Sequence, residues 1–139
     1  MVKMAQFTTI VKAPLENVWR HLIFKIENPE NFVPGISDVF ILEKNDNFVL
    51  RKMTITTPDS TTTLSEKITF IPYKVRFLLI EHPKFEGCVD NDIKFVSENE
   101  TEITFTMNWF DKITKSEFDN FELVKNAVIK TKAYIEENL

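Results

Sequence analysis

The C-terminal stretch of the chain carries the feature that most constrains its fold. From Thr114 to Leu139, apolar residues recur at steps of three and four, which places them on one face of a long α-helix. Thr114 and Glu117 have the spacing of a capping box at the start of that helix. The stripe consists of Phe118, Phe121, Val124, Val128, Thr131, Ile135 and Leu139, flanked by Leu123, Ala127 and Tyr134. At about 1.5 Å per residue the helix is roughly 35 Å long, so we expect it to lie across a sheet.

The segment before this helix is predicted to begin with a strand and two helical pieces. Alternation over residues 6–11 indicates a strand, and Pro14 is well placed in the first turn of a following helix. The segment Asn28 to Ile36 contains two prolines with Gly35 directly after the second, which predicts a short helical turn with a sharp exit. The buried side of the longer helix is predicted to consist of Val18, Trp19, Leu22, Ile23 and Ile26.

Six antiparallel strands are predicted between Ile36 and Phe110. Their register follows from four hairpin loops, which we place at residues 45–46, 58–59, 72–73 and 98–100. The predicted neighbours in successive strands are Leu42, Val49, Ile68 and Phe77 in one row, and Phe40, Arg51, Glu66 and Leu79 in the next. The last hairpin is predicted to pair Phe95 with Ile103, Ile93 with Phe105, Asn91 with Met107 and Val89 with Trp109. A slip of one residue would turn each set to solvent, so their agreement supports this register.

Length and composition exclude several classes of function. A chain of 139 residues with 43% hydrophobic residues is long enough for one core, and we expect one domain over residues 1–139. Only two glycines are present, which excludes the glycine-rich phosphate loops of nucleotide-binding folds. The net charge is −4 and the lysines are dispersed, which argues against a nucleic acid or an anionic membrane surface as partner. A small molecule or a protein is the expected partner.

The remaining residue types predict neither metal nor cofactor. The single cysteine, Cys88, cannot form a disulfide within the chain, and His21 and His82 lie far apart without zinc-ligand spacing. The first residues contain no apolar signal-peptide core, and no stretch reaches the roughly 18 apolar residues of a membrane span. We therefore expect a cytoplasmic protein, as a monomer or weak homodimer.

Both the order of elements and several short phrases resemble one superfamily. The phrases are Ile10 to Pro14, Val18 to Leu22, Asn28 to Ile36 and Glu81 to Pro83. Together they resemble the START-like, helix-grip (SRPBCC) superfamily, which includes the birch-pollen allergen and aromatic polyketide cyclases. Within it the chain is most similar to the AtaL-like branch, through the segment from Asn-Pro-Glu to Pro-Gly-Ile, and the resemblance covers the whole chain.

This resemblance implies an α+β fold of the helix-grip type. Its curved seven-stranded antiparallel sheet wraps around the long C-terminal helix, and two short helices follow the first strand. A gap between the concave face and the helix would be a ligand cavity. Since the superfamily contains carriers, cyclases, hydrolases and regulators on one scaffold, the resemblance leaves the chemistry open.

Arg51 and Glu66 are the most informative polar residues, because the predicted register places both on the apolar side of adjacent strands. The simpler interpretation is a mutually satisfied ion pair in the cavity wall. The functional one has Arg51 holding a carboxylate or enolate while Glu66 acts as a base. His82 is expected at the rim, Cys88 outside the cavity. The residues predicted to contact a ligand are Trp19, Phe32, Phe40, Arg51, Met53, Glu66, Phe77, Leu79, Asn91, Ile93, Met107, Trp109, Phe121, Val124 and Val128.

Three functions remain open from the sequence. The first is a module that binds a hydrophobic or aromatic small molecule, including lipids or polyketides. The second is an enzyme of the cyclase or isomerase kind with Glu66 as base and Arg51 as oxyanion partner. The third is a regulatory module that docks against another protein.

Overall fold

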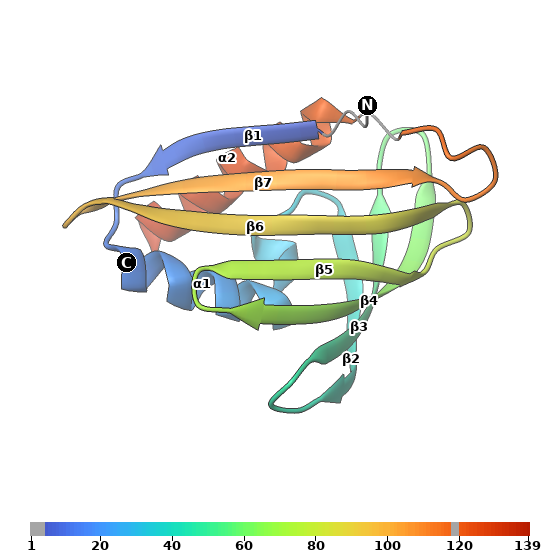
Figure 1. Ribbon diagram of the computed structural model, residues 1–139, viewed down its shortest axis with the longest axis horizontal. Coiled ribbons are helices and arrows are strands. Elements are labelled where there is room, and N and C mark those ends of the chain that lie inside the picture. The colour runs from blue at the N-terminus through green and yellow to red at the C-terminus, as the bar shows by residue number, and fades with distance from the viewer. Residues whose placement is uncertain (1–4, 118–119) are drawn as a thin grey trace.

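A computed structural model describes residues 5–117 and 120–139 of the chain (Figure 1). Two helices, one 3₁₀ turn and seven strands follow one another in the predicted order. Their bounds are β1 Ala5–Val11, α1 Leu15–Glu27, η1 Pro29–Asn31, β2 Ile36–Lys44, β3 Val49–Thr56, β4 Thr61–Ile71, β5 Lys74–Glu81, β6 Phe85–Ser97, β7 Glu100–Asp111 and α2 Phe121–Glu137.

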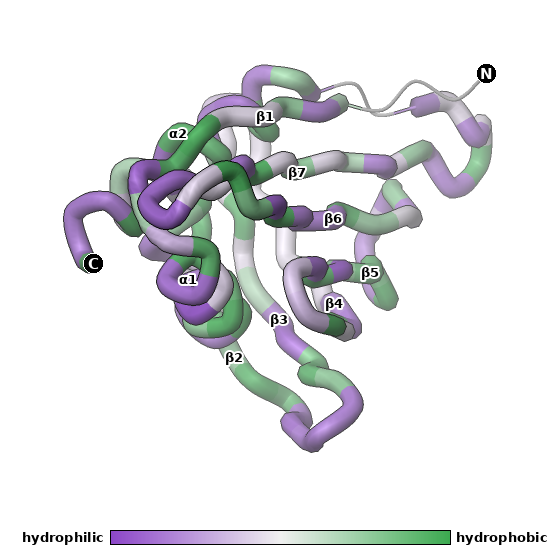
Figure 2. Tube along the Cα trace, turned by 60° about the vertical axis from the view of Figure 1, so that its left-hand side comes forward, coloured by the Kyte–Doolittle hydropathy of each residue, from purple (hydrophilic) through white to green (hydrophobic). Residues whose placement is uncertain are grey.

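The seven strands form a single antiparallel sheet in the order β1-β7-β6-β5-β4-β3-β2. β1 is therefore an edge strand of the sheet and lies beside β7, and Phe7 on β1 pairs with Phe105 on β7. The sheet curves strongly, and both helices lie on its concave side (Figures 1 and 2). This arrangement confirms the predicted helix-grip α+β fold.

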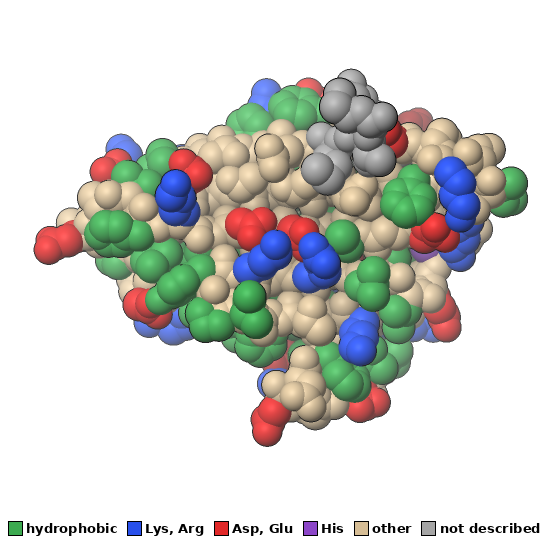
Figure 3. All heavy atoms as spheres, in the orientation of Figure 1, with side chains coloured by type: hydrophobic (Ala, Val, Ile, Leu, Met, Phe, Trp, Pro, Cys, Tyr) green, Lys and Arg blue, Asp and Glu red, His purple; other side chains and the backbone are tan. Residues whose placement is uncertain are grey.

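Charged side chains gather over the middle of the opposite, convex face (Figure 3). Arg76 on β5 pairs with Asp90 on β6 at 2.8 Å, and Lys74 lies 3.8 Å from Asp92. The middle of the convex face is therefore polar, and the apolar residues that alternate with these charged ones on β5 and β6 face the helices.

The core lies between the concave face and the two helices. From α2, Val124, Val128 and Ile135 are buried, and α1 contributes Val18 and Leu22. Burying one such aliphatic side chain contributes roughly 1.5–3 kcal/mol. Of the stripe read from the sequence, Val124, Val128, Thr131 and Ile135 are buried and form one wall of the core, whereas Phe121 and Leu139 are 42% and 64% exposed. Among the described residues, no helix is both long enough and apolar enough to cross a membrane.

The predicted capping box at the start of α2 is wrong. The helix begins at Phe121, and its N-cap is Asn120, whose Oδ1 accepts a hydrogen bond from the backbone N–H of Leu123. Thr114 instead belongs to a tight turn in which Asp111 Oδ1 accepts from its backbone N–H at 3.0 Å. Lys115 in that turn has φ +62°, a left-handed conformation that a right-handed helix cannot include. Phe118, part of the predicted stripe, lies outside the described residues.

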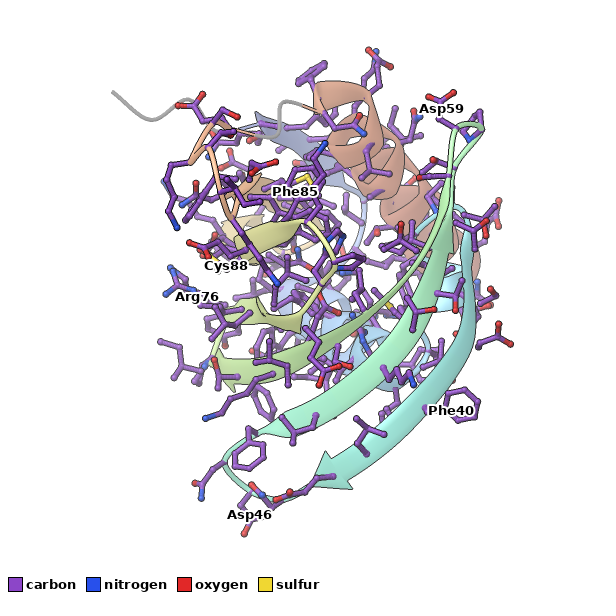
Figure 4. All side chains as sticks on the ribbon, turned by 90° about the vertical axis from the view of Figure 1, so that its right-hand side faces the viewer. Phe40, Asp46, Asp59, Arg76, Phe85 and Cys88 are labelled. Atoms are coloured by element: carbon purple, nitrogen blue, oxygen red, sulfur yellow. The ribbon has the colours of Figure 1, made fainter. Side chains whose placement is uncertain are left out.

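The predicted register of β2 is wrong beyond its first residues. Ile36 does pair with Ile55, as the turn at residues 45–46 requires, but two register shifts follow. At the first shift Asp38 adopts φ +49°, and Phe40 then faces Lys52 rather than Arg51. An extra residue in a strand reverses the face of every residue after it. Phe40 is therefore 59% exposed and points away from the interior (Figure 4).

The same shifts displace Leu42 from the row predicted for it. The residue opposite Val49 is Lys44, and Leu42 is exposed. The other hairpins around this row, with turns at 58–59 and 72–73, have the predicted register: Val49 pairs with Ile68, and Ile68 with Phe77.

The last hairpin differs from the prediction by two residues. Phe95 pairs with Thr101 and Ile93 with Ile103, because the turn is tighter than predicted and a register irregularity lies next to it. Asn91 consequently faces Phe105. A shift of two residues keeps every side chain on its face, so Asn91 still points inward and is fully buried.

The sharp exit after η1 depends on Gly35. Its φ is +82°, and a Cβ there would lie 2.2 Å from the carbonyl oxygen of Thr56. The Gly35 carbonyl in turn accepts a hydrogen bond from the Thr56 N–H at 2.8 Å. Only glycine fits this close approach, which returns the chain into β2 as predicted.

Candidate functional site

A small cavity lies between the concave face of the sheet and the helices. Its volume is about 90 Å³. We call it the inner cavity. Its lining residues are Lys25, Pro29, Val33, Ile36, Arg51, Met53, Ile55, Glu66, Phe77, Val89, Asn91, Phe105, Met107, Trp109, Leu123, Val124 and Ala127.

Four polar side chains are embedded in this otherwise apolar wall. Lys25 from α1, Arg51 from β3, Glu66 from β4 and Asn91 from β6 are all buried, and we call them the polar cluster. A buried polar group is costly unless it is hydrogen-bonded, so their mutual geometry decides what the cavity can accept.

Arg51 and Glu66 form one half of the cluster. The register pairs the two residues directly, as predicted, and Arg51 Nη2 donates to Glu66 Oε1 at 2.5 Å. Arg51 Nη1 donates to the carbonyl oxygen of Ile26 at 2.8 Å, which ties β3 to the end of α1. The guanidinium also lies over the ring of Phe77, 5.2 Å from its centroid. The pair is held on several sides and its charges compensate each other.

Lys25 and Asn91 form the other half. Lys25 Nζ donates to Asn91 Oδ1 at 2.6 Å and lies over the rings of Phe77 and Phe105, at 4.4 and 4.8 Å from their centroids. Aromatic faces attract a cation, so these rings favour the protonated amine. Burial has the larger, opposite effect and, with the positive charge of Arg51 adding to it and the carboxylate of Glu66 opposing it, lowers the pKa of Lys25 to about 7.

The cluster contains more hydrogen-bond donors than the protein satisfies. Arg51 Nε and Asn91 Nδ2 are buried and have no hydrogen-bond partner among the described residues. Both are N–H donors, and donors without acceptors cost free energy in an apolar surrounding. The arrangement can therefore accept a group that offers lone pairs.

A wider pocket, which we call the outer pocket, opens beside the inner cavity. Its volume is about 760 Å³ and it lies between the β3–β4 turn, the loop before β6 and the start of α2. Ile55, Trp109 and Leu123 line both spaces and thus stand between them. Figure 4 views the molecule toward this end, with the Asp59 turn beside α2. The two spaces therefore adjoin at these three side chains.

His82 lies at the wall of the outer pocket. Its Nδ1 accepts hydrogen bonds from the backbone N–H groups of Lys84 and Phe85, both at 3.0 Å, and its ring packs 5.3 Å from that of Trp109. Burial and the charge of Lys112 lower the pKa of His82. These contacts fit a structural residue at the rim.

The structure places the residues predicted to contact a ligand in three groups. At the inner cavity it brings together Arg51, Met53, Glu66, Phe77, Asn91, Met107, Trp109 and Val124. In the core, but not among the cavity-lining residues, are Phe32, Leu79, Ile93 and Val128. Farther away are Phe40, Trp19, which packs against Phe70 and Tyr73, and Phe121, which is 42% exposed and packs against Phe7.

Lys25 is the principal site residue that the sequence reasoning missed. The signal was present, because Val18, Leu22 and Lys25 are separated by four and three residues and share the apolar face of α1. A charged residue on such a face indicates a buried partner. Phe105, Leu123 and Ala127 also line the inner cavity, where the sequence predicts contacts only from their neighbours on the same elements.

Among residues 5–117 and 120–139, no group of three or more His, Cys, Asp or Glu side chains could hold a metal ion. Cys88 lies on the convex side with Arg76, away from the inner cavity (Figure 4). The polar cluster itself offers an amine, a guanidinium, a carboxylate and an amide.

Comparison with known protein families decides where the chain belongs. The sequence model of the family described as AtaL, acetylaranotin biosynthesis cluster protein L, matches residues 10–137. The chain belongs to the AtaL family. Among the curated proteins no match to this AtaL-family chain was found.

Solved structures show that the AtaL-family chain has the START-like, helix-grip fold. The protein TTHA0849 from Thermus thermophilus superimposes with a TM-score of 0.77 at 11% identity, covering 96% of this chain and 97% of that one. A START superfamily protein from Mycobacterium smegmatis gives 0.74 at 12% identity, covering 96% and 94%. The Zhui aromatase/cyclase from Streptomyces sp. R1128 gives 0.71 at 14% identity, covering 98% and 86%.

Proposed function

We propose that the chain binds one hydrophobic or aromatic small molecule between the concave face of the sheet and α2. The observation that carries this proposal is a cavity with mostly apolar walls and a polar cluster buried inside it. Ligand sites have this composition, an apolar enclosure with a few convergent polar groups that set orientation.

The volumes indicate how a ligand would be accommodated. Pockets for drug-sized ligands measure about 300–1,000 Å³, several times the 90 Å³ of the inner cavity. The inner cavity is thus matched to one end of a ligand, and the remainder would extend past Trp109 and Leu123 into the outer pocket.

A cavity-filling substitution tests the proposal. Ala127 lines the inner cavity, whereas Ala133 lies exposed on the same helix. Ala127→Leu places an isobutyl group where the ligand would lie, and Ala133→Leu makes the same change outside. A dye that fluoresces in apolar surroundings should bind the unaltered chain and Ala133→Leu with saturable, roughly one-to-one stoichiometry.

Ala127→Leu should bind the same dye at least tenfold more weakly while keeping a cooperative melting transition. Apolar competitors should displace the dye from the unaltered chain. If the folded, unaltered chain binds no dye at micromolar concentration, the interior is closed to ligands and the proposal fails.

A second candidate function is a cyclase-type enzyme with Glu66 as base and Arg51 as oxyanion partner. It is favoured by the position of both residues in the cavity wall and by the fold shared with the Zhui aromatase/cyclase. A base acting on a bound poly-β-ketone would need a free carboxylate oxygen. Cyclisation of a poly-β-keto thioester that is lost in Glu66→Gln, with binding retained, would support the enzyme. Binding without turnover would favour the carrier function over the enzyme.

A further inference from the structure

We infer that the ligand carries an anionic group, such as a carboxylate or an enolate, and that Lys25 together with the amide N–H of Asn91 holds it. This inference rests on the proposed function and specifies the class of ligand. It is carried by the position of Lys25 and by the balance of charges and donors around the inner cavity.

The charge balance comes from three residues. Of the described residues that line the inner cavity, only Lys25, Arg51 and Glu66 carry charges. Glu66 accepts from Arg51, so that pair is neutral, whereas the protonated amine of Lys25 donates to the neutral oxygen of Asn91. One positive charge is left over. An isolated buried charge is unfavourable, and an anion placed beside it removes the cost.

The donor balance indicates the same class. Asn91 accepts a hydrogen bond from Lys25 through its side-chain oxygen. Its Nδ2 group has no partner among the described residues and is therefore available to donate to another group. An ammonium group carries three N–H donors, and within the described part of the chain one oxygen, that of Asn91, accepts from Lys25. A carboxylate supplies two acceptor oxygens, enough to take one hydrogen bond from each of these neighbouring residues.

Proton uptake is a further consequence of this arrangement. The charged groups that face Lys25 are Arg51 from β3 and Glu66 from β4, while β5, β6 and β7 contribute Phe77, Asn91 and Phe105, which do not titrate. With its pKa near 7, the amine of Lys25 is mostly neutral at pH 8 in the empty cavity. A bound anion raises that pKa, so binding at pH 8 takes up about one proton, and binding at pH 6 takes up almost none.

The test compares benzoate with benzamide, which have the same shape and differ in charge. Isothermal titration at pH 6.5 should give at least tenfold tighter binding of benzoate. In Lys25→Met this preference should fall at least fivefold while the affinity for benzamide stays within about twofold. Arg20→Met removes a cation from an exposed position on the same helix and should keep the preference.

A second measurement uses the unaltered chain and so does not depend on any variant folding. Titrating benzoate at pH 8 in two buffers of different ionisation enthalpy should reveal uptake of about one proton per ligand. Equal affinity for the two probes, a preference that survives in Lys25→Met, or no proton uptake at pH 8 overturns the inference. If one of these results is found and the dye still binds, the proposed function stands and only the anion site is wrong. If neither the dye nor the two probes bind, the proposed function and the anion site both fail.

Discussion

Arg51 and Glu66 face each other across β3 and β4, and their side chains, 3% and 4% exposed, form an ion pair of 2.5 Å. Removing either partner would leave a charge in an apolar surrounding, which typically costs about 3–5 kcal/mol. We therefore expect Arg51→Met and Glu66→Gln each to lower the free energy of unfolding strongly, and the double variant to lose much less than the sum.

Urea unfolding of the four chains measures this coupling. The double variant should still lose some stability, because the carbonyl oxygen of Ile26 then lacks the hydrogen bond from Arg51. Additive effects close to zero would contradict the buried pair.

Lys25 should make stability depend on pH. Burial lowers its pKa from 10.5 in the unfolded chain to about 7 in the folded one. Between these two pH values the unfolded chain binds more protons than the folded chain, so the free energy of unfolding rises with pH above about 7. Below pH 7 the full cost of burying the charged amine applies. We expect a gain of about 2 kcal/mol between pH 7 and pH 9 that Lys25→Met lacks. Denaturant unfolding of the unaltered chain and of Lys25→Met at pH 7 and pH 9 measures this gain. The same change in stability with pH in both chains would mean that the amine of Lys25 lies in water.

Ile135 and Ile129 test the packing of α2 with one residue type. Ile135 is fully buried and Ile129 is 46% exposed on the same helix. Ile135→Ala should cost about 2–5 kcal/mol through lost burial and the cavity left behind. Ile129→Ala should stay within about 0.5 kcal/mol of the unaltered chain. Thermal or urea unfolding distinguishes them, and equal costs would mean that α2 presents another face to the sheet.

Asn120 tests the start of that helix. Its side chain caps the helix through Leu123, so Asn120→Ala should cost about 1 kcal/mol. Thr114→Ala changes the residue first predicted as the cap and should cost less than about 0.5 kcal/mol. The reverse ranking in urea unfolding would restore the capping box at Thr114.

Much of the fold could be predicted because its signals are local. The turns at residues 58–59 and 72–73 are two residues long, and such turns fix the register of the strands on either side. That register alone placed Arg51 opposite Glu66. The stripe over α2 likewise follows from helix geometry.

The errors arose where tertiary context selects between local alternatives. The bulges that turn Phe40 outward insert residues that leave no distinct pattern in the sequence. Thr114 and Asn120 are both suitable caps, and the turn built on Asp111 decides between them. The place of Lys25 on the apolar face of α1 can be read from the sequence, but its partner cannot, because only the packing of α1 against β6 brings its amine to Asn91.

The central claim, that a small molecule binds between the sheet and α2, is tested most directly by native mass spectrometry of the freshly purified chain. We predict a species with one retained small molecule for the unaltered chain and for Ala133→Leu, and its loss in Ala127→Leu. After removal of that molecule, one equivalent of an apolar acid should restore the heavier species. A folded chain that appears only at its own mass, before and after addition of such an acid, would contradict the account.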